Sequence, residues 1–97
     1  MARLIPEGGF AVAEATCPAP DGGFTRAAVR ALLGAPAPAR MDAFPLPTGG
    51  YLFARRPSPD LVGTFSANLR ASALCGWLIY GPAVVTLPAE RIDWDAP

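Results

Sequence analysis

The stretch from Thr64 to Leu87, TFSANLRASALCGWLIYGPAVVTL, holds the only asparagine of the chain and its longest apolar run. Ser66 is a residue type that caps helices, because its hydroxyl can accept a hydrogen bond from a free amide of the first turn. Ala67 to Cys75 is rich in helix formers, and Gly76 follows where a helix usually stops. We therefore expect a helix that Ser66 caps and Gly76 ends.

Two short strands are expected after this helix. Trp77 to Tyr80 is an apolar run of strand formers. Gly81-Pro82 interrupts it, because proline has no amide to donate, and Val84 to Leu87 resumes the strand pattern. The whole run is too short for a membrane span, which takes about 20 residues. The order is then helix, glycine stop, strand, bend and strand, with Leu69 and Leu74 turned toward the core.

Two β-hairpins are expected before this stretch. In the first, Arg3 to Pro6 and Phe10 to Thr16 flank the pair Gly8-Gly9, which can supply the positive φ of a tight turn. In the second, Met41 to Leu46 and Tyr51 to Arg55 flank a turn at positions 47–50. The prolines in the first strand of this second hairpin favour a short strand or one at the edge of a sheet.

The clearest helix signal runs from Thr25 to Leu33, since Thr25 can cap the helix and Gly34 can end it. A stripe of apolar side chains at helical spacing would face the core: Val29, Leu32 and Leu33. Arg26 and Arg30 lie one turn apart on the opposite face. They could bind a phosphate or a carboxylate, although a solvated helix face is the more common reason for such charges.

The remaining segments are expected to be irregular, apart from the end of the chain. Pro57 to Gly63 is a predicted loop. In the tail from Ala89 to Pro97, Ile92 and Trp94 alternate with charged residues, which is the pattern of an edge strand. This tail could pair with the chain's own sheet or with a second copy, and its tryptophan favours a segment that is tied down.

Length and composition point to one small domain over positions 1–97. The predicted fold class is α+β, with two β-hairpins, two helices and C-terminal strands completing a mixed or antiparallel sheet. Hydrophobic residues make up 52% of the chain and charged residues only 16%. That balance is low in charge for a monomer, so we expect a homo-oligomer, most simply a dimer. The alternative is that many alanines are surface residues without a partner.

The charged residues exclude several classes of function. The net charge is +0, and every basic residue is an arginine. A neutral domain lacks the field that attracts long nucleic acids. The chain has no histidine, so a Ser-His-Asp triad or a histidine metal ligand is excluded within one chain. We expect no cofactor, no metal site and no membrane partner.

The cysteines and the N-terminus bear on localisation. Cys17 and Cys75 are the only two cysteines. Because no signal peptide is visible at the N-terminus, we expect a cytoplasmic protein, in which both would be unpaired thiols.

The start of the central helix is the predicted site. A helix N-terminus favours anions, so Asn68 could recognise an amide or base edge and Arg70 could hold a phosphate. Asp60 completes the predicted ligand-binding set, and the ligand would be small and anionic, such as a nucleotide. The alternative is that Asn68 satisfies neighbouring backbone groups. No catalytic residue is assigned.

Two motifs of the chain resemble a small phage and prophage family that is classified as a domain of unknown function. They are Asn68-x-x-Ala71-x-x-Leu74 and the run from Gly81 to Val85. In the N-terminal half, Leu4-Ile5-Pro6 before Gly8-Gly9 and the segment from Phe24 to Gly34 are also similar. The resemblance implies an α+β fold in a mobile element and implies no activity. Where members tend to be acidic, this chain instead has Pro57-Ser58-Pro59-Asp60.

The expected function is therefore a non-enzymatic accessory or binding protein of a phage or mobile element. A small hydrolase or nuclease-like enzyme that uses Asp60, Asn68 and Arg70 is the first alternative. A structural assembly subunit is the second, and a flat apolar face would favour it.

Overall fold

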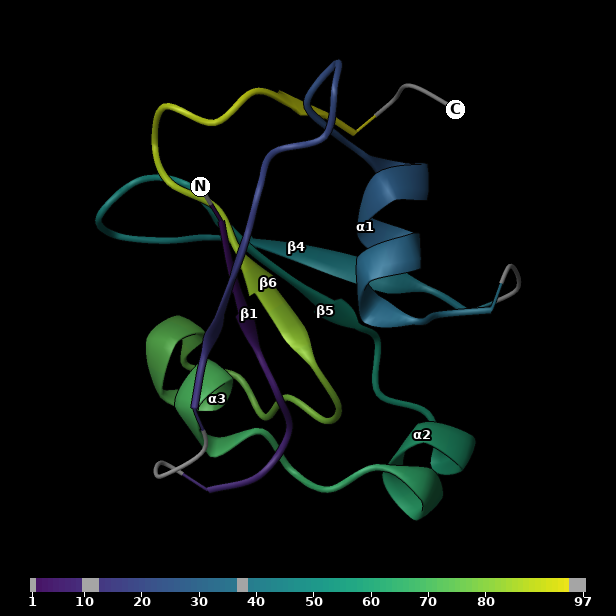
Figure 1. The fold of residues 1–97 in the computed structure, drawn as a ribbon. Helices are drawn as coiled ribbons and strands as arrows, with labels where there is room; N and C mark the ends of the chain where they lie inside the picture. Colours follow the sequence, from purple (N-terminus) through teal and green to yellow (C-terminus); the bar gives the residue numbers. More distant parts are fainter. Residues whose placement is uncertain (1, 10–12, 37–38, 95–97) are drawn as a thin grey trace.

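The structure is a computed structural model that describes residues 2–9, 13–36 and 39–94, and only the backbone at positions 60–62. These residues form one α+β domain, so the expected fold class is confirmed (Figure 1). The strands are β1 (Ala2–Ile5), β2 (Ala15–Cys17), β3 (Phe24–Thr25), β4 (Met41–Pro45), β5 (Tyr51–Arg55), β6 (Ala83–Val85) and β7 (Ile92–Asp93). The helices are α1 (Arg26–Leu33), α2 (Pro59–Thr64) and α3 (Leu69–Cys75).

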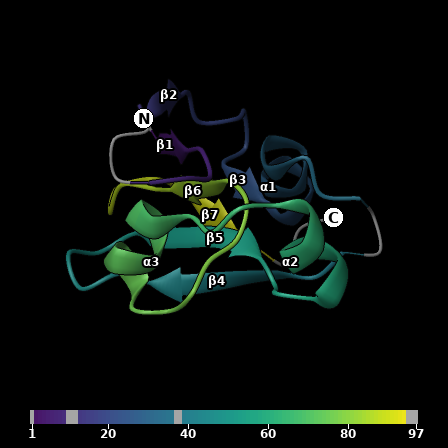
Figure 2. The same ribbon diagram turned by 90° about the horizontal axis from the view of Figure 1, so that it is seen from below.

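Five strands form an antiparallel sheet in the order β2-β1-β6-β5-β4, while β3 and β7 form a small parallel pair. Figure 2 shows the five strands one below another, with β4 at one edge. The middle strand β6 pairs with β1 from the start of the chain and with β5 from its centre. Val84 lies opposite both Leu4 and Phe53 in this register.

Side chains along the sheet alternate between two cores, because successive residues of a strand point to opposite faces. On one face, Phe53 and Val84 pack with Val29 and Leu33 of α1. On the other, Leu52 and Val85 of the sheet belong to a second cluster with Ala71 of α3 and Ile79. The sheet is therefore covered on one face by α1, which lies between β2 and β4 in sequence, and on the other by α3, which lies between β5 and β6.

Helix α1 confirms the signals read from the sequence. The side chain of Thr25 accepts a hydrogen bond from the amide of Ala28 at 3.1 Å, which is the expected cap. Gly34 ends the helix with φ 64°, in the left-handed region that glycine adopts without strain. Val29 and Leu33 are buried, and full burial of such a side chain stabilises the fold by roughly 1.5–3 kcal/mol.

The two hairpins differ in how well the sequence located them. The β4–β5 hairpin has the expected strands and turn, with Met41 opposite Arg55. The first pair, β1 and β2, is also antiparallel, but its connection is longer than the tight Gly8-Gly9 turn that we expected. Gly8 instead exchanges backbone hydrogen bonds with the residues before α3, because its amide donates to the Ala67 carbonyl. Phe10 to Val12 of the expected strand lie outside the described residues.

The start of α3 corrects the expected cap. Asn68, and not Ser66, is the N-cap, since its side-chain oxygen accepts a hydrogen bond from the Ala71 amide at 3.0 Å. The backbone amide of Ser66 donates to the Glu7 carboxylate, outside the helix. Leu69 and Leu74 are also exposed, and the buried residue of this helix is Ala71. The expectation that both leucines face the core was therefore wrong.

The segment after α3 is a loop rather than the expected first strand. From Trp77 to Tyr80, only Tyr80 forms a β-bridge, with Ala67. The following strand is β6 at Ala83–Val85, slightly earlier than predicted. The Ile79 backbone instead bonds the α3 region, since its amide donates to the Ser72 hydroxyl at 2.8 Å and its carbonyl accepts from the Asn68 amide at 2.7 Å.

The C-terminal segment pairs with its own chain, through the parallel strands β3 and β7. This pairing confirms that Ile92 is held in a strand, although the partner is the segment before α1 and not the main sheet. Gly23 has φ 86° and an added Cβ would collide with the Arg91 carbonyl, so the close approach of these segments requires glycine. The predicted loop from Pro57 to Gly63 was wrong in part, because α2 lies there.

Both cysteines are free thiols, as expected, and Cys17 is buried against the α1 side of the sheet. Burial, followed by the negative charge of Glu90, raises the pKa of the Cys17 thiol above its ordinary value of 9.0. Among the residues that the structure describes, no helix has the length and hydrophobicity needed to cross a membrane.

Candidate anion-binding site

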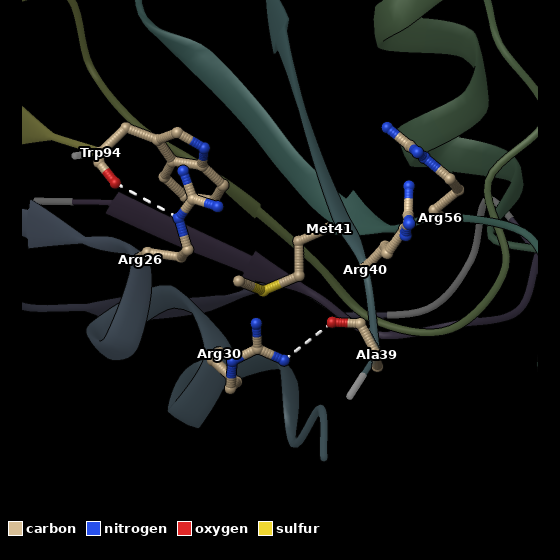
Figure 3. A pocket seen from close by; sticks show the side chains of 7 residues that line it. All are labelled: Arg26, Arg30, Ala39, Arg40, Met41, Arg56 and Trp94. Carbon is tan, nitrogen blue, oxygen red and sulfur yellow. Dashed lines mark hydrogen bonds between the residues drawn. The ribbon is translucent and has the colours of Figure 1, made fainter. Parts of the chain in front are cut away.

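Four arginines from distant parts of the chain surround one cavity of about 340 Å³, which we call the basic pocket. Its lining residues are Arg26, Arg30, Ala39, Arg40, Met41, Arg56 and Trp94. Figure 3 shows that the two arginines of α1 come from one side, whereas Arg40 and Arg56 lie on the other side of Met41. The pocket therefore lies where α1 meets the open ends of β4 and β5.

Helix α1 brings Arg26 and Arg30 to the pocket because residues four apart share one helix face. The Nε of Arg26 donates to the Trp94 carbonyl at 3.3 Å. The Nη1 of Arg30 donates to the carbonyls of Pro36 and Ala39, at 2.7 Å and 2.8 Å. These bonds hold both guanidinium groups in place. A guanidinium carries five N–H donors, so donors remain for a ligand.

Arg40 and Arg56 face each other across the end of the β4–β5 hairpin, where the Arg56 amide donates to the Arg40 carbonyl at 2.8 Å. Like charges directly opposite in an antiparallel pair repel, so this arrangement favours a nearby anion. Asp42 supplies part of this negative charge, because its Oδ1 accepts a hydrogen bond from Nη2 of Arg56 at 2.7 Å. This hydrogen bond with Asp42 raises the pKa of Arg56 above its ordinary value. The Arg40 side chain makes no hydrogen bond or ion pair within the described part of the chain.

Trp94 closes one side of the basic pocket with its indole ring. One face of the ring stacks on Phe53, with centroids 4.9 Å apart and planes inclined by 14°. The Arg26 guanidinium carbon lies 5.2 Å from the centroid of the same ring. This cation–π contact, together with the hydrogen bond to the Trp94 carbonyl, couples the C-terminal segment to the pocket.

A second cavity of about 400 Å³ adjoins the basic pocket, since Ala39, Arg40 and Arg56 line both. Its other lining residues are Pro36, Arg55, Pro57 and Ser58. The Nε of Arg55 is buried without a hydrogen-bond partner, and its guanidinium carbon lies 5.2 Å from the Phe65 ring centroid. The second cavity thus adds a fifth arginine and two proline rings to the surface next to the basic pocket.

The two cavities concentrate positive charge in a chain whose net charge is +0. Their lining residues include five arginines and no carboxylate. Arginine is suited to phosphate and carboxylate groups, because its planar fork of donors can bind two oxygens at once. The arrangement can therefore hold a small anion by charge-assisted hydrogen bonds.

The three residues of the predicted site do not meet in either cavity. Asn68 is fully buried at 0% exposure, and its Nδ2 donates to the carbonyls of Ile5 and Gly81 at 3.0 Å and 2.9 Å. Arg70 lies in α3, and its Nη1 is 3.3 Å from Oε2 of Glu14. Asp60 lies in α2, and its side chain is outside the described part. The ligand-binding role of these residues stays a prediction, while the structure gives Asn68 the backbone-satisfying role.

The sequence pointed to half of the basic pocket. Arg26 and Arg30 were recognised as a possible anion pair, but Arg40 and Arg56 were missed. The signal that could have found them is the hairpin itself. A turn centred on positions 47–50 pairs Met41 with Arg55 and therefore places positions 40 and 56 opposite each other.

Comparisons with protein-family models, with curated proteins and with solved structures find no significant match. The function is therefore inferred from the residues of the basic pocket. Among the described residues, no three potential ligands of the His, Cys, Asp and Glu types gather in one place.

Proposed function

We propose that this protein is a non-enzymatic binding protein for a small anionic ligand, such as a nucleotide, and that the ligand lies in the basic pocket. The observation that carries the proposal is the convergence of four arginines on one cavity without a carboxylate among its lining residues. A neutral chain that collects half of its eight basic side chains at one place offers a local anion site without a general field for polyanions.

The volumes of the two adjoining cavities, about 340 Å³ and 400 Å³, suit a nucleotide that occupies both. Ligand sites commonly have volumes of roughly 300–1,000 Å³, and the basic pocket alone is at the low end of that range with 340 Å³. Phosphate groups would lie among Arg26, Arg30 and Arg40. The less polar part of the ligand would lie in the second cavity, against Pro36 and Pro57.

Binding is favoured over catalysis by the side chains of the basic pocket. They supply positive charge, a thioether and an indole, but no carboxylate, hydroxyl or thiol that could act as a general base or nucleophile. The accessory role in a phage or mobile element rests on the family resemblance and remains part of the proposal. The hydrolase-like alternative would have to use Asp60, Asn68 and Arg70 instead.

Isothermal titration calorimetry at about 0.15 M salt, where exposed charges are largely screened, tests the proposal with inorganic pyrophosphate and ATP as probes. Arg40→Ala should weaken binding by at least about tenfold, because a hydrogen bond to a charged group contributes roughly 1.5–3 kcal/mol. The melting temperature should stay unchanged, since Arg40 is exposed and makes no bond that the fold needs.

Two variants with the same change in net charge are the controls. Arg91→Ala removes an exposed arginine that lines neither cavity. It should leave the affinity within about twofold, because salt screens exposed charges that do not touch the ligand. Arg70→Ala separates the two candidate sites. Loss of binding in Arg70→Ala with normal binding in Arg40→Ala would transfer the site to α3, and no binding to the wild type would overturn the proposal.

A further inference from the structure

The edge of the sheet at β4 carries backbone groups that no described segment uses. One residue beyond each end of β4, the Arg40 carbonyl accepts a hydrogen bond from the Arg56 amide and the Leu46 amide donates to the Gly50 carbonyl, so both positions face β5. Bonding positions alternate along an antiparallel strand, so residues 42 and 44 also face β5. The backbones of Met41, Ala43 and Pro45 therefore face outward. They present two N–H groups, since Pro45 has none, and three carbonyls.

An exposed apolar patch lies beside this edge, on the face of the sheet that α3 covers. Trp77 and Leu78 are 66% and 56% exposed, which is unusual for such large apolar side chains. The Trp77 ring lies 6.3 Å from the ring of Phe44 in β4, with planes inclined by 30°. A cavity of about 320 Å³ between β4 and the loop after α3 is lined by Phe44, Trp77 and Leu78 among others.

We propose that β4 pairs with β4 of a second copy of the chain, antiparallel and about a two-fold axis at Ala43. The N–H and C=O of the two Ala43 residues then bond reciprocally. The Met41 N–H of each copy bonds the Pro45 carbonyl of the other. The pairing uses every outward N–H group of the strand. It joins the two sheets into one and places the two Trp77 patches on the same face of the joined sheet, one on each side of the seam.

The charges beside the edge select this register. With the axis at Ala43, Asp42 of one copy lies opposite Phe44 of the other. With the axis one residue earlier, the two Asp42 side chains would lie directly opposite, where like charges destabilise an antiparallel pair.

A second copy fits this edge better than a peptide from another protein. The backbone bonds favour neither occupant, since any added strand would use the same two N–H groups and three carbonyls. A second copy is favoured because a two-fold axis doubles the apolar contribution, as each copy brings its own Trp77 and Leu78. Two-fold dimers are also the commonest closed assembly, and the 16% charged content leaves apolar surface to cover.

Light scattering after size-exclusion chromatography at tens of micromolar tests the pairing. The wild type should be a dimer and Ala43→Pro a monomer, with unchanged circular dichroism. Proline removes the outward N–H alone, and Pro45 already occupies the equivalent outward position two residues along the strand. Trp77→Ser leaves the strand backbone intact and should raise the dimer dissociation constant at least about tenfold.

Leu87→Ser is the matched control, because Leu87 is 46% exposed but lies outside the patch. It should leave the dimer unchanged. A monomeric wild type would overturn the proposal, and so would a dimer that survives Ala43→Pro. A dimer that survives Ala43→Pro would show that another surface forms the interface and that β4 does not pair with a second copy.

Discussion

Trp94 stacks almost parallel on Phe53, with ring centroids 4.9 Å apart, although 41 positions separate the two residues in the chain (94 − 53). Phe53 is fully buried in the centre of the sheet, whereas Trp94 belongs to the last described segment. The contact anchors the C-terminal segment to the core beside α1. It also sets one wall of the basic pocket, so the pocket depends on the tail.

Replacement of Trp94 tests this anchor. Trp94→Ala should lower the free energy of unfolding by about 1–3 kcal/mol, because it removes a stacked aromatic side chain that is only partly buried. Trp94→Phe keeps a ring against Phe53 and should recover most of that loss. Thermal unfolding of both variants measures the difference. Equal melting temperatures for Trp94→Ala and the wild type would show that the tail is not held.

Asn68 should be among the residues to which the fold is most sensitive. Asn68→Ala removes the cap of α3 and leaves the carbonyls of Ile5 and Gly81 without their donor. A lost cap costs about 1 kcal/mol and each orphaned buried group about 1–3 kcal/mol, so the sum is about 3 kcal/mol or more.

Ser66→Ala is the control for this prediction, because Ser66 was the cap expected from the sequence. Its effect should stay below about 0.5 kcal/mol, the usual range for a surface substitution. Urea unfolding of both variants gives the comparison. A larger loss in Ser66→Ala than in Asn68→Ala would contradict the capping described above.

Removal of Asp42 should strengthen anion binding at the basic pocket. Asp42 lies outside the lining residues but neutralises Arg56, which is one of them. Asp42→Asn would free the Arg56 guanidinium for the ligand. It should raise the affinity for pyrophosphate by about two- to fivefold, because an exposed ion pair contributes only about 0.2–1 kcal/mol. Calorimetry measures the change. A weaker affinity in Asp42→Asn would mean that Asp42 positions Arg56 rather than competing with the ligand.

Stability should fall at alkaline pH because of Cys17. Its thiol has a raised pKa in the folded state, chiefly by burial, so the unfolded chain loses this proton at lower pH than the folded one. The stabilisation is complete below the unfolded pKa near 9.0 and is lost as pH rises toward the folded value. The free energies of unfolding of the wild type and Cys17→Ala, measured from pH 7 to 10, should become more similar as the pH rises. A constant difference between the two would contradict the prediction.

The features that the sequence predicted well depend on neighbouring residues. Thr25 and Gly34 lie within one turn of the helix that they delimit, and the 47–50 turn directly joins β4 and β5. In such cases capping and turn geometry are sufficient, since the relevant bonds join residues close in sequence.

The features that it missed depend on distant partners. Asn68 outcompetes Ser66 as a cap because it also bonds Ile5, which lies 63 positions away. Trp77 to Tyr80 has strand-forming residues, but the Ile79 backbone bonds the Ser72 side chain and the Asn68 amide instead of a neighbouring strand. The basic pocket likewise joins α1, the β4–β5 end and the tail, and no local pattern records that they meet.

The central place of β6 affects how the protein forms during synthesis. At roughly 5–20 residues per second, the ribosome reaches β6 about 4–16 s after β1, because roughly 80 residues separate them. During that interval β1 and β5 each lack the neighbour that joins them. The nascent chain therefore exposes two unpaired apolar edges until β6 has been made. This order makes completion of the sheet depend on β6, and until then the unpaired edges of β1 and β5 are exposed to aggregation.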